Sequence, residues 1–266
     1  MLNKSIMLFF VIAGFVAFAC IAEAQVVQDG LVSYWGFEGG DVSDQVGDND
    51  GTINGDPEVV AGKIGDALKF DKDGDNVTFP TNGVPTGNSP MTWSAWFKRE
   101  VSDAGGVQYI ATYGFPHCCG RFFGIGTRGG DQVFMTQWGG GFDVFGPVVS
   151  LGDWHHVVAV YNGSQNDTIY LNGEMVASMD LPEMPDVVDT NAGAIGSNPG
   201  INPGPHETND GQPGPPGEFF EGLIDDVGLY NRALSADEVI QNFAATVAVE
   251  PVGKLASTWA HIKSTK

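Results

Sequence analysis

Acidic residues near the C-terminal end of the sequence are the first candidates for chemistry. A retaining glycosidase needs two carboxyl groups roughly 5 Å apart, which on one strand requires acids two or four positions apart on the same face. Glu218 and Glu221 are three positions apart, so a strand would point them to opposite faces. Glu221 and Asp225 do share a face and are the pair that remains.

The histidines and serines lack the patterns of other hydrolytic centres. His155 and His156 are adjacent on a predicted strand, so one side chain should face the core and the other should face outward. They are therefore poorly placed to share a metal ion, and the spacing of zinc ligands is absent from the sequence. The sequence also lacks the Gly-x-Ser-x-Gly motif of a nucleophilic serine.

Aromatic and polar residues in the middle of the sequence are candidates for a binding site. Trp138 is flanked by glycines that can leave its ring exposed, and Tyr113, His117 and Arg121 lie in a loop region that could border the same face. Sugar sites use aromatic faces together with a few polar groups. We expect these four residues to line a carbohydrate-binding face; the alternative for each is ordinary packing.

Cys118 and Cys119 are adjacent, so together they cannot cross-link distant parts of a fold. In an oxidising compartment such thiols are liable to oxidation. We expect a strained vicinal disulfide, whose flat surface could support a sugar ring. The alternatives are two reduced, buried thiols and a bridge between two molecules.

The charge of the chain restricts its partners. Thirty-three acidic residues outweigh twelve Lys and Arg, which gives a formal net charge of −21 in 266 residues. Such a chain offers no basic surface to the phosphates of nucleic acid or to an anionic membrane. It fits an extracellular protein and a protein that binds cations.

The N-terminal segment has the features of a signal peptide. Residues 1–24 hold one Lys, an apolar run over residues 6–21 and a small-x-small pattern that ends at Ala24. We expect cleavage there, with the mature chain secreted, periplasmic or on the cell surface and without a membrane span; the alternative is an uncleaved anchor. Residues 25–245 then form one domain, and residues 246–266 form a tail.

Short apolar segments between turns predict an all-β fold. Residues 91–98 alternate, with Met91, Trp93, Ala95 and Phe97 on one face. Many segments of this kind, without alternating helical signals, are typical of an antiparallel sandwich.

Turn and cap signals complete the prediction. Asn172 and Gly173 predict a tight hairpin. Ser235 and Glu238 predict the N-terminal capping box of one short helix. Residues 198–217, rich in Pro and Gly, predict a long surface loop.

Four stretches, taken together, resemble the laminin G-like branch of the concanavalin A-like lectin and glucanase superfamily. They cover residues 30–38, 67–71, 154–173 and 220–235, and the last is the most specific. The resemblance implies a jellyroll β-sandwich of two antiparallel sheets with one concave face, and it places Trp35, Trp93 and Trp154 in the core. The sequence departs from the family pattern at Gly228, where Arg is common, and in the long loop.

The resemblance also implies a structural calcium ion at the edge of the sandwich. In this family the ion often ties the N-terminal loop to an acid of the last strand, the position of Asp225. Asp44 and Asp48 could supply oxygen ligands from the early loop, and calcium prefers oxygen ligands. The alternative is that these acids only cap turns.

The structural role that the resemblance implies for Asp225 leaves no pair of acids for catalysis. We therefore expect a secreted, non-catalytic module that binds carbohydrate or a glycoconjugate, with glycans or glycoproteins as partners. The alternatives are an extracellular protein-interaction or adhesion domain and, less favoured, a diverged polysaccharide hydrolase or lyase.

Overall fold

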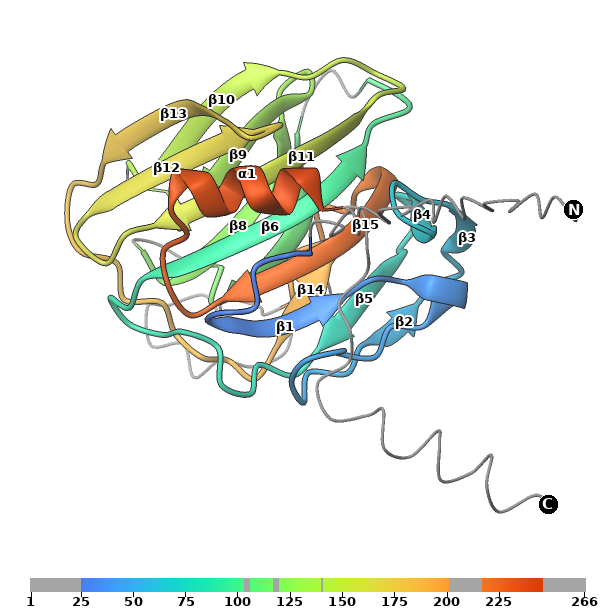
Figure 1. The fold of residues 1–266 in the computed structure, drawn as a ribbon, viewed down its shortest axis with the longest axis horizontal. Helices are drawn as coiled ribbons and strands as arrows, with labels where there is room; N and C mark the ends of the chain where they lie inside the picture. The colour runs from blue at the N-terminus through green and yellow to red at the C-terminus, as the bar shows by residue number, and fades with distance from the viewer. Residues whose placement is uncertain (1–24, 103–105, 117–119, 140, 201–216, 246–266) are drawn as a thin grey trace, which may run out of the picture.

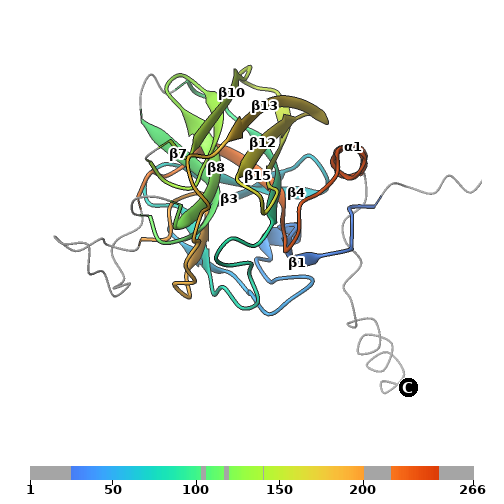
Figure 2. The ribbon, with the colours of Figure 1, turned by 90° about the vertical axis from the view of Figure 1, so that its left-hand side faces the viewer.

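A computed structural model describes residues 25–102, 106–116, 120–139, 141–200 and 217–245. The predicted signal peptide, the predicted tail, most of the Pro- and Gly-rich loop, His117, Cys118 and Cys119 lie outside the described residues. Within these ranges the strands form two antiparallel sheets packed face to face, which confirms the predicted all-β sandwich (Figures 1 and 2).

The first sheet consists, in spatial order, of β13 (Glu174–Asp180), β12 (Asn166–Leu171), β11 (Trp154–Tyr161), β6 (Met91–Lys98), β15 (Glu221–Tyr230), β4 (Asp66–Asp71) and β3 (Glu58–Ala61), with β1 (Leu31–Trp35) also paired to β15. The second sheet consists of β10 (Asp143–Val148), β9 (Gln132–Thr136), β8 (Phe122–Arg128), β7 (Val107–Gly114), β14 (Gly193–Ile195), β5 (Asn76–Phe79) and β2 (Thr52–Asn54). The helical elements are the 3-10 turn η1 (Glu38–Gly40) and the helix α1 (Ala236–Ala244).

The hydrophobic core lies between the two sheets and follows from strand alternation. Met91, Trp93, Ala95 and Phe97 of β6 all point into it, as the sequence predicts. Trp35 is also fully buried there. The prediction for Trp154 was wrong: this side chain is only half-buried at the start of β11, beside Lys98, whose Nζ lies 5.7 Å from the ring centroid.

The helix α1 covers the outer face of the first sheet, as Figures 1 and 2 show. Its capping box is present, with Ser235 accepting from the backbone N–H of Glu238 and Glu238 accepting from that of Ser235. Val239 packs on Val158 and Tyr230, so the helix buries an apolar patch that would otherwise face water. Among the described residues, the longest helix is too short to cross a membrane.

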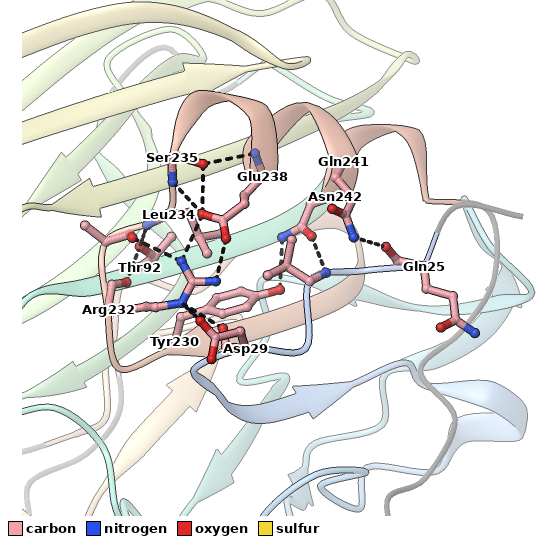
Figure 3. A network of polar contacts seen from close by, with 12 residues as sticks. Gln25, Asp29, Thr92, Tyr230, Arg232, Leu234, Ser235, Glu238, Gln241 and Asn242 are labelled. Atoms are coloured by element: carbon pink, nitrogen blue, oxygen red, sulfur yellow. Dashed lines mark hydrogen bonds and ion pairs between the residues drawn. The ribbon is translucent and has the colours of Figure 1, made fainter.

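A polar network joins the helix to the last strand and to the start of the domain (Figure 3). Arg232 makes two bonds to Glu238, at 2.9 and 2.7 Å, and pairs with Asp29 at 3.0 Å. Asn242 accepts from the backbone N–H of Val27 at 2.8 Å and donates to the hydroxyl of Tyr230 at 2.9 Å. The specific motif over residues 220–235 therefore serves the architecture, because its side chains tie chain segments together.

The predicted hairpin joins β12 to β13. Asn172 and Gly173 have φ values of 52° and 85°, and Leu171 pairs with Glu174. Both turn residues therefore have the positive φ that a type I′ turn requires.

Candidate binding cleft

A cleft of about 190 Å³ lies on the outer face of the second sheet. This face is opposite to the one that packs on the core, and α1 lies on the other side of the sandwich (Figure 2). The residues that line the cleft come from β7, β8, β9, β10, the turn between β9 and β10, and the segment before β15: Val107, Tyr109, Arg128, Phe134, Thr136, Trp138, Gly139, Asp143 and Glu218.

An aromatic cluster lies at the cleft: Tyr109, Phe134 and Trp138 are among its lining residues, and Phe122 packs against them. The rings of Tyr109 and Trp138 are stacked at an interplanar angle of 25°, with centroids 6.5 Å apart. Phe122 meets the Trp138 ring edge-on at 5.4 Å, and Phe134 packs on Tyr109 at 5.8 Å. Phe122 and Phe134 share the outer face because they alternate along their strands with core residues, and Trp138 joins them from the turn after β9.

The turn between β9 and β10 holds Trp138 in an unusual conformation. Its φ is +75°, which is uncommon for a residue with a side chain. Its backbone N–H donates to the hydroxyl of Thr136 at 2.7 Å, and Gly139 follows with φ +64°. The ring is half-buried, so part of its surface is open to the cleft. The glycines beside Trp138 therefore permit the turn that presents the ring, as the sequence suggests.

Two carboxylates and one guanidinium supply the polar groups. Arg128 pairs with Asp143 at 3.4 Å, and Thr136 donates its hydroxyl hydrogen to the same carboxylate. Glu218 is half-buried and accepts from Asn198 at 3.1 Å. Burial raises the pKa of Glu218, while the Asn198 hydrogen bond and the charge of Arg128 lower it. An aromatic surface bordered by hydrogen-bonding groups is the arrangement that recognises a sugar ring.

Of the other predicted ligand residues, His117 lies outside the described residues, and Tyr113 and Arg121 do not line this cleft. Tyr113 was placed wrongly: its side chain is fully buried in the core, where its hydroxyl donates to the carbonyl of Pro85 at 2.9 Å. Strict alternation would put Tyr109 and Tyr113 on the same face, but the bulge between Tyr109 and Ala111 shifts the pattern by one residue, so Tyr113 points into the core and Tyr109 to the cleft. The guanidinium of Arg121 lies 5.2 Å from the ring centroid of Phe115, outside the cleft lining.

Most of the cleft residues were missed by sequence reasoning. A period-two assignment of β9 could have found Phe134, which lies between the core residues Val133 and Met135. The same rule fails for Tyr109, because the bulge in β7 breaks the period between it and Tyr113. Asp143 and Glu218 are distant in sequence and give no local signal. They line the same cleft because β10 pairs with β9 in this sheet and the backbone of Glu218, before β15, bonds to Tyr109 of β7.

The three predicted calcium ligands have different surroundings. Asp44 is buried, and its carboxylate accepts from the backbone N–H groups of Tyr34, Val46 and Asn49 at 3.0 to 3.1 Å. Asp48 is exposed. In the described part of the chain, no group of three or more His, Cys, Asp or Glu side chains is placed to hold a metal ion. Asp44 therefore caps a loop, and the three predicted residues do not form one shared set of ligands.

Asp225 is buried beside Asp226. One oxygen of Asp225 accepts from the backbone N–H groups of Lys63 and Ile64, at 2.7 and 3.1 Å, and the Tyr34 hydroxyl donates to Asp226. The other oxygen of each carboxylate is buried without a hydrogen-bond partner. Gly62 allows this approach, because a Cβ there would lie 2.5 Å from Asp225 Oδ2. The orphaned oxygens are compatible with a cation at Asp225 and Asp226.

A second, smaller cavity lies beneath α1, and Ser94, His156 and Asp226 are among its lining residues. Ser94 Oγ and His156 Nε2 are 2.9 Å apart, but the buried His156 Nδ1 has no hydrogen-bond partner. A catalytic triad requires a carboxylate at that nitrogen. Burial lowers the pKa of His156 to about 3, so the ring is neutral. The cavity, about 10 Å³, has room for one water molecule rather than a substrate.

The adjacent histidines point to opposite faces of the strand, as predicted, but both are buried. His155 packs against Phe97, a core residue, at 5.7 Å. His156 points to the outer face of the sheet, as alternation requires, but it lies there between Trp96 and Phe243 of α1. The helix converts an outward position into a buried one.

Solved structures with the same fold include carbohydrate-active and toxin proteins. Domain 4 of AbnA, a GH43 extracellular arabinanase from Geobacillus stearothermophilus solved with arabinotriose, is 21% identical, with a TM-score of 0.57 and coverage of 84% of this chain and 99% of that one. The binding domain of Paraclostridial Mosquitocidal Protein 1 is 16% identical, with a TM-score of 0.60 and coverage of 81% and 52%. At these identities the likeness shows the fold alone.

Trypanosoma rangeli sialidase is 17% identical, with a TM-score of 0.58, and the match covers 84% of this chain but only 34% of the sialidase. A search of curated proteins finds no match. A laminin G family model, described as the concanavalin A-like lectin/glucanases superfamily, matches residues 71–240. Since this match spans more than half of the sequence and the two-sheet sandwich agrees with it, the chain belongs to the concanavalin A-like lectin/glucanases superfamily.

Proposed function

We propose that this protein binds carbohydrate through the cleft on the outer face of the second sheet. The observation that carries the proposal is the half-buried Trp138 ring, stacked on Tyr109 and bordered by Asp143 and Glu218. A sugar ring can place its apolar face on the indole while its hydroxyl groups bond to the carboxylates. The likeness to an arabinanase domain solved with arabinotriose supports the same class of ligand.

The test is retention on polysaccharides. Trp138→Ala should weaken binding about tenfold or more, because aromatic anchors carry a large share of binding energy. Trp154→Ala is the matched control, since Trp154 is also half-buried but lies on the first sheet and outside the cleft lining. Affinity electrophoresis against a panel of neutral, amino and acidic polysaccharides, followed by calorimetry, measures both variants. Equal binding by Trp138→Ala and the wild type would contradict the proposed site.

We further propose that binding occurs without catalysis. Asp143 is engaged by Arg128 and Thr136, which favours a positioning role over attack on a sugar. The second candidate function is glycoside hydrolysis, favoured by one observation: Asp143 and Glu218 line the same cleft, and a hydrolase needs two such carboxyl groups. Sustained release of reducing sugar that both Asp143→Asn and Glu218→Gln abolish would establish the hydrolase.

An extracellular protein-interaction or adhesion domain is the other alternative. A protein that retains no polysaccharide and releases no product would favour it. We also propose secretion, supported by the sequence of residues 1–24. Mass spectrometry of the expressed protein tests this, since cleavage after Ala24 would leave Gln25 as the first residue.

A further inference from the structure

We propose that the cleft selects glycans that carry amino groups and excludes acidic glycans. The inference rests on the carbohydrate-binding function proposed above and names the chemical class of the ligand. It follows from the charges that line the cleft and from the aromatic rings beside them.

The cleft is negatively charged even after its ion pair is counted. Its ionisable lining groups at neutral pH are Arg128, Asp143 and Glu218. Arg128 is committed to Asp143 at 3.4 Å, and its guanidinium also lies 5.7 Å from the ring centroid of Phe145. Asp143 receives the Thr136 hydroxyl as well. Among the described residues the carboxylate of Glu218 forms no ion pair, and the charge of Arg128 acts on it only from a greater distance.

Glu218 is held in place, and among the described residues only one oxygen of its carboxylate accepts a hydrogen bond. Asn198 donates to Oε2 at 3.1 Å, and the backbone carbonyl of Glu218 accepts from the N–H of Tyr109 at 3.1 Å. The residue is half-buried beside the aromatic cluster, where the field of a charge is less screened than in open water. A positive group bound there would gain a charge-assisted hydrogen bond.

The aromatic cluster also favours a positively charged ligand. Trp138 is half-buried and lines the cleft, stacked on the buried Tyr109, and the face of an indole ring attracts ammonium groups. An acidic sugar would instead bring a carboxylate or sulfate beside Glu218, in a protein whose net charge is already −21. An amino sugar therefore matches both the carboxylate and the rings, whereas a uronic acid matches neither.

Three β-1,4-linked tetrasaccharides test the inference: glucosamine, which is cationic, glucose, which is neutral, and glucuronic acid, which is anionic. Calorimetry at low salt should give the glucosamine tetramer about tenfold tighter binding than the glucose tetramer, since a charge-assisted hydrogen bond is about twice as strong as a neutral one. The glucuronic acid tetramer should bind more weakly than glucose. The advantage of glucosamine should shrink as salt is added.

Glu218→Gln should abolish the preference for glucosamine while it keeps binding of the glucose tetramer, because the amide can still accept from Asn198. Glu174→Gln is the matched control, since Glu174 is exposed on β13, outside the cleft lining, and its loss changes the net charge equally. Thermal unfolding checks that both variants are folded. A preference that survives in Glu218→Gln overturns the inference.

Equal binding of the glucosamine and glucose tetramers, or tightest binding of the glucuronic acid tetramer, also overturns the inference but leaves the carbohydrate-binding function standing. Failure of all three tetramers to bind overturns the inference as well. In that case retention on the polysaccharide panel, and its loss in Trp138→Ala, decides separately whether the proposed function fails.

Discussion

Asp225 and Asp226 are consecutive residues of β15, yet both of their carboxylates are buried at the point where this strand changes its neighbour. Ile224 and the residues before it pair with β4, whereas Val227 and the residues after it pair with β1. A bulge separates the two regions, and Asp226 has φ +48°. The two carboxylates fill the gap between β1 and β4, where they accept hydrogen bonds from groups outside the sheet ladder.

This pair should make the metal-free protein more stable as the pH falls from 8 to 6.5. Burial, and then the charge of Asp226, raises the pKa of Asp225 from 3.8 to about 8, and burial raises that of Asp226 to about 7. Because the folded pKa values exceed the unfolded ones, the stabilisation by bound protons is complete below about pH 4 and is lost as the pH rises through 7 and 8. Calorimetry in a chelator should show a rising Tm on acidification, flattened in Asp226→Asn. An unchanged slope in that variant would refute the assignment.

Calcium should raise the Tm of the wild-type protein, and a chelator should lower it. A cation beside Asp225 and Asp226 would compensate two buried charges, and a ligand in hundredfold excess over its Kd stabilises the folded state by about 2.7 kcal/mol. Asp225→Asn should lose the effect. Asp48, exposed in the early loop, tests whether this loop supplies ligands. If Asp48→Asn keeps the calcium-dependent rise in Tm, the ligands come from β15 without Asp48. If the variant loses it, the early loop contributes a ligand. Identical melting in calcium and in chelator would exclude the site.

His156 should make the protein less stable as the pH falls below 6.5. Burial lowers the pKa of this side chain from 6.5 to about 3, so the unfolded chain takes up a proton in this range and the folded chain does not. The stability that the neutral ring contributes is present above pH 6.5 and is lost toward pH 3, by at most about 1.4 kcal/mol per pH unit. Urea unfolding at pH 7 and 4.5 should show a smaller loss for His156→Gln than for the wild type. The same loss in both would mean that another group causes it.

Substitution of Tyr113 should affect stability and leave glycan binding unchanged. Tyr113→Ala should cost about 3–5 kcal/mol, because it removes a fully buried aromatic ring. Tyr113→Phe should cost less, about 1–3 kcal/mol, through the Pro85 carbonyl that loses its donor. Denaturant titrations measure the cost, and calorimetry with a bound oligosaccharide measures affinity. If the Tyr113→Phe protein is folded but binds the oligosaccharide more weakly, Tyr113 belongs to the binding site after all.

Cys118 and Cys119 are expected to form a vicinal disulfide in the secreted protein. Both residues lie outside the described part of the chain, so the prediction rests on their adjacency and on an oxidising compartment. The intact mass without reductant should be about two daltons below that of the dithiol, because the bond removes two hydrogen atoms. Two alkylated thiols, or a dimer that separates on reduction, would disprove the ring.

The sequence determined the sandwich because local rules specify its parts. Alternation in β6 assigns Trp93 and Phe97 to the core, Asn172 and Gly173 specify a tight turn, and Ser235 with Glu238 specifies a helix start. Each of these signals depends on residues within a few positions of each other, so it can be read without knowledge of the fold.

Tertiary structure decided which residues line the cleft and whether His156 is buried. Glu218 and Asp143 line the same cleft only because the sheet brings distant segments together, and Tyr109 faces it while Tyr113 faces the core because a bulge in β7 shifts the alternation between them. His156 points outward as alternation predicts, but α1 covers it. Alternation specifies which residues share a face; what covers that face depends on long-range packing, which no local pattern encodes.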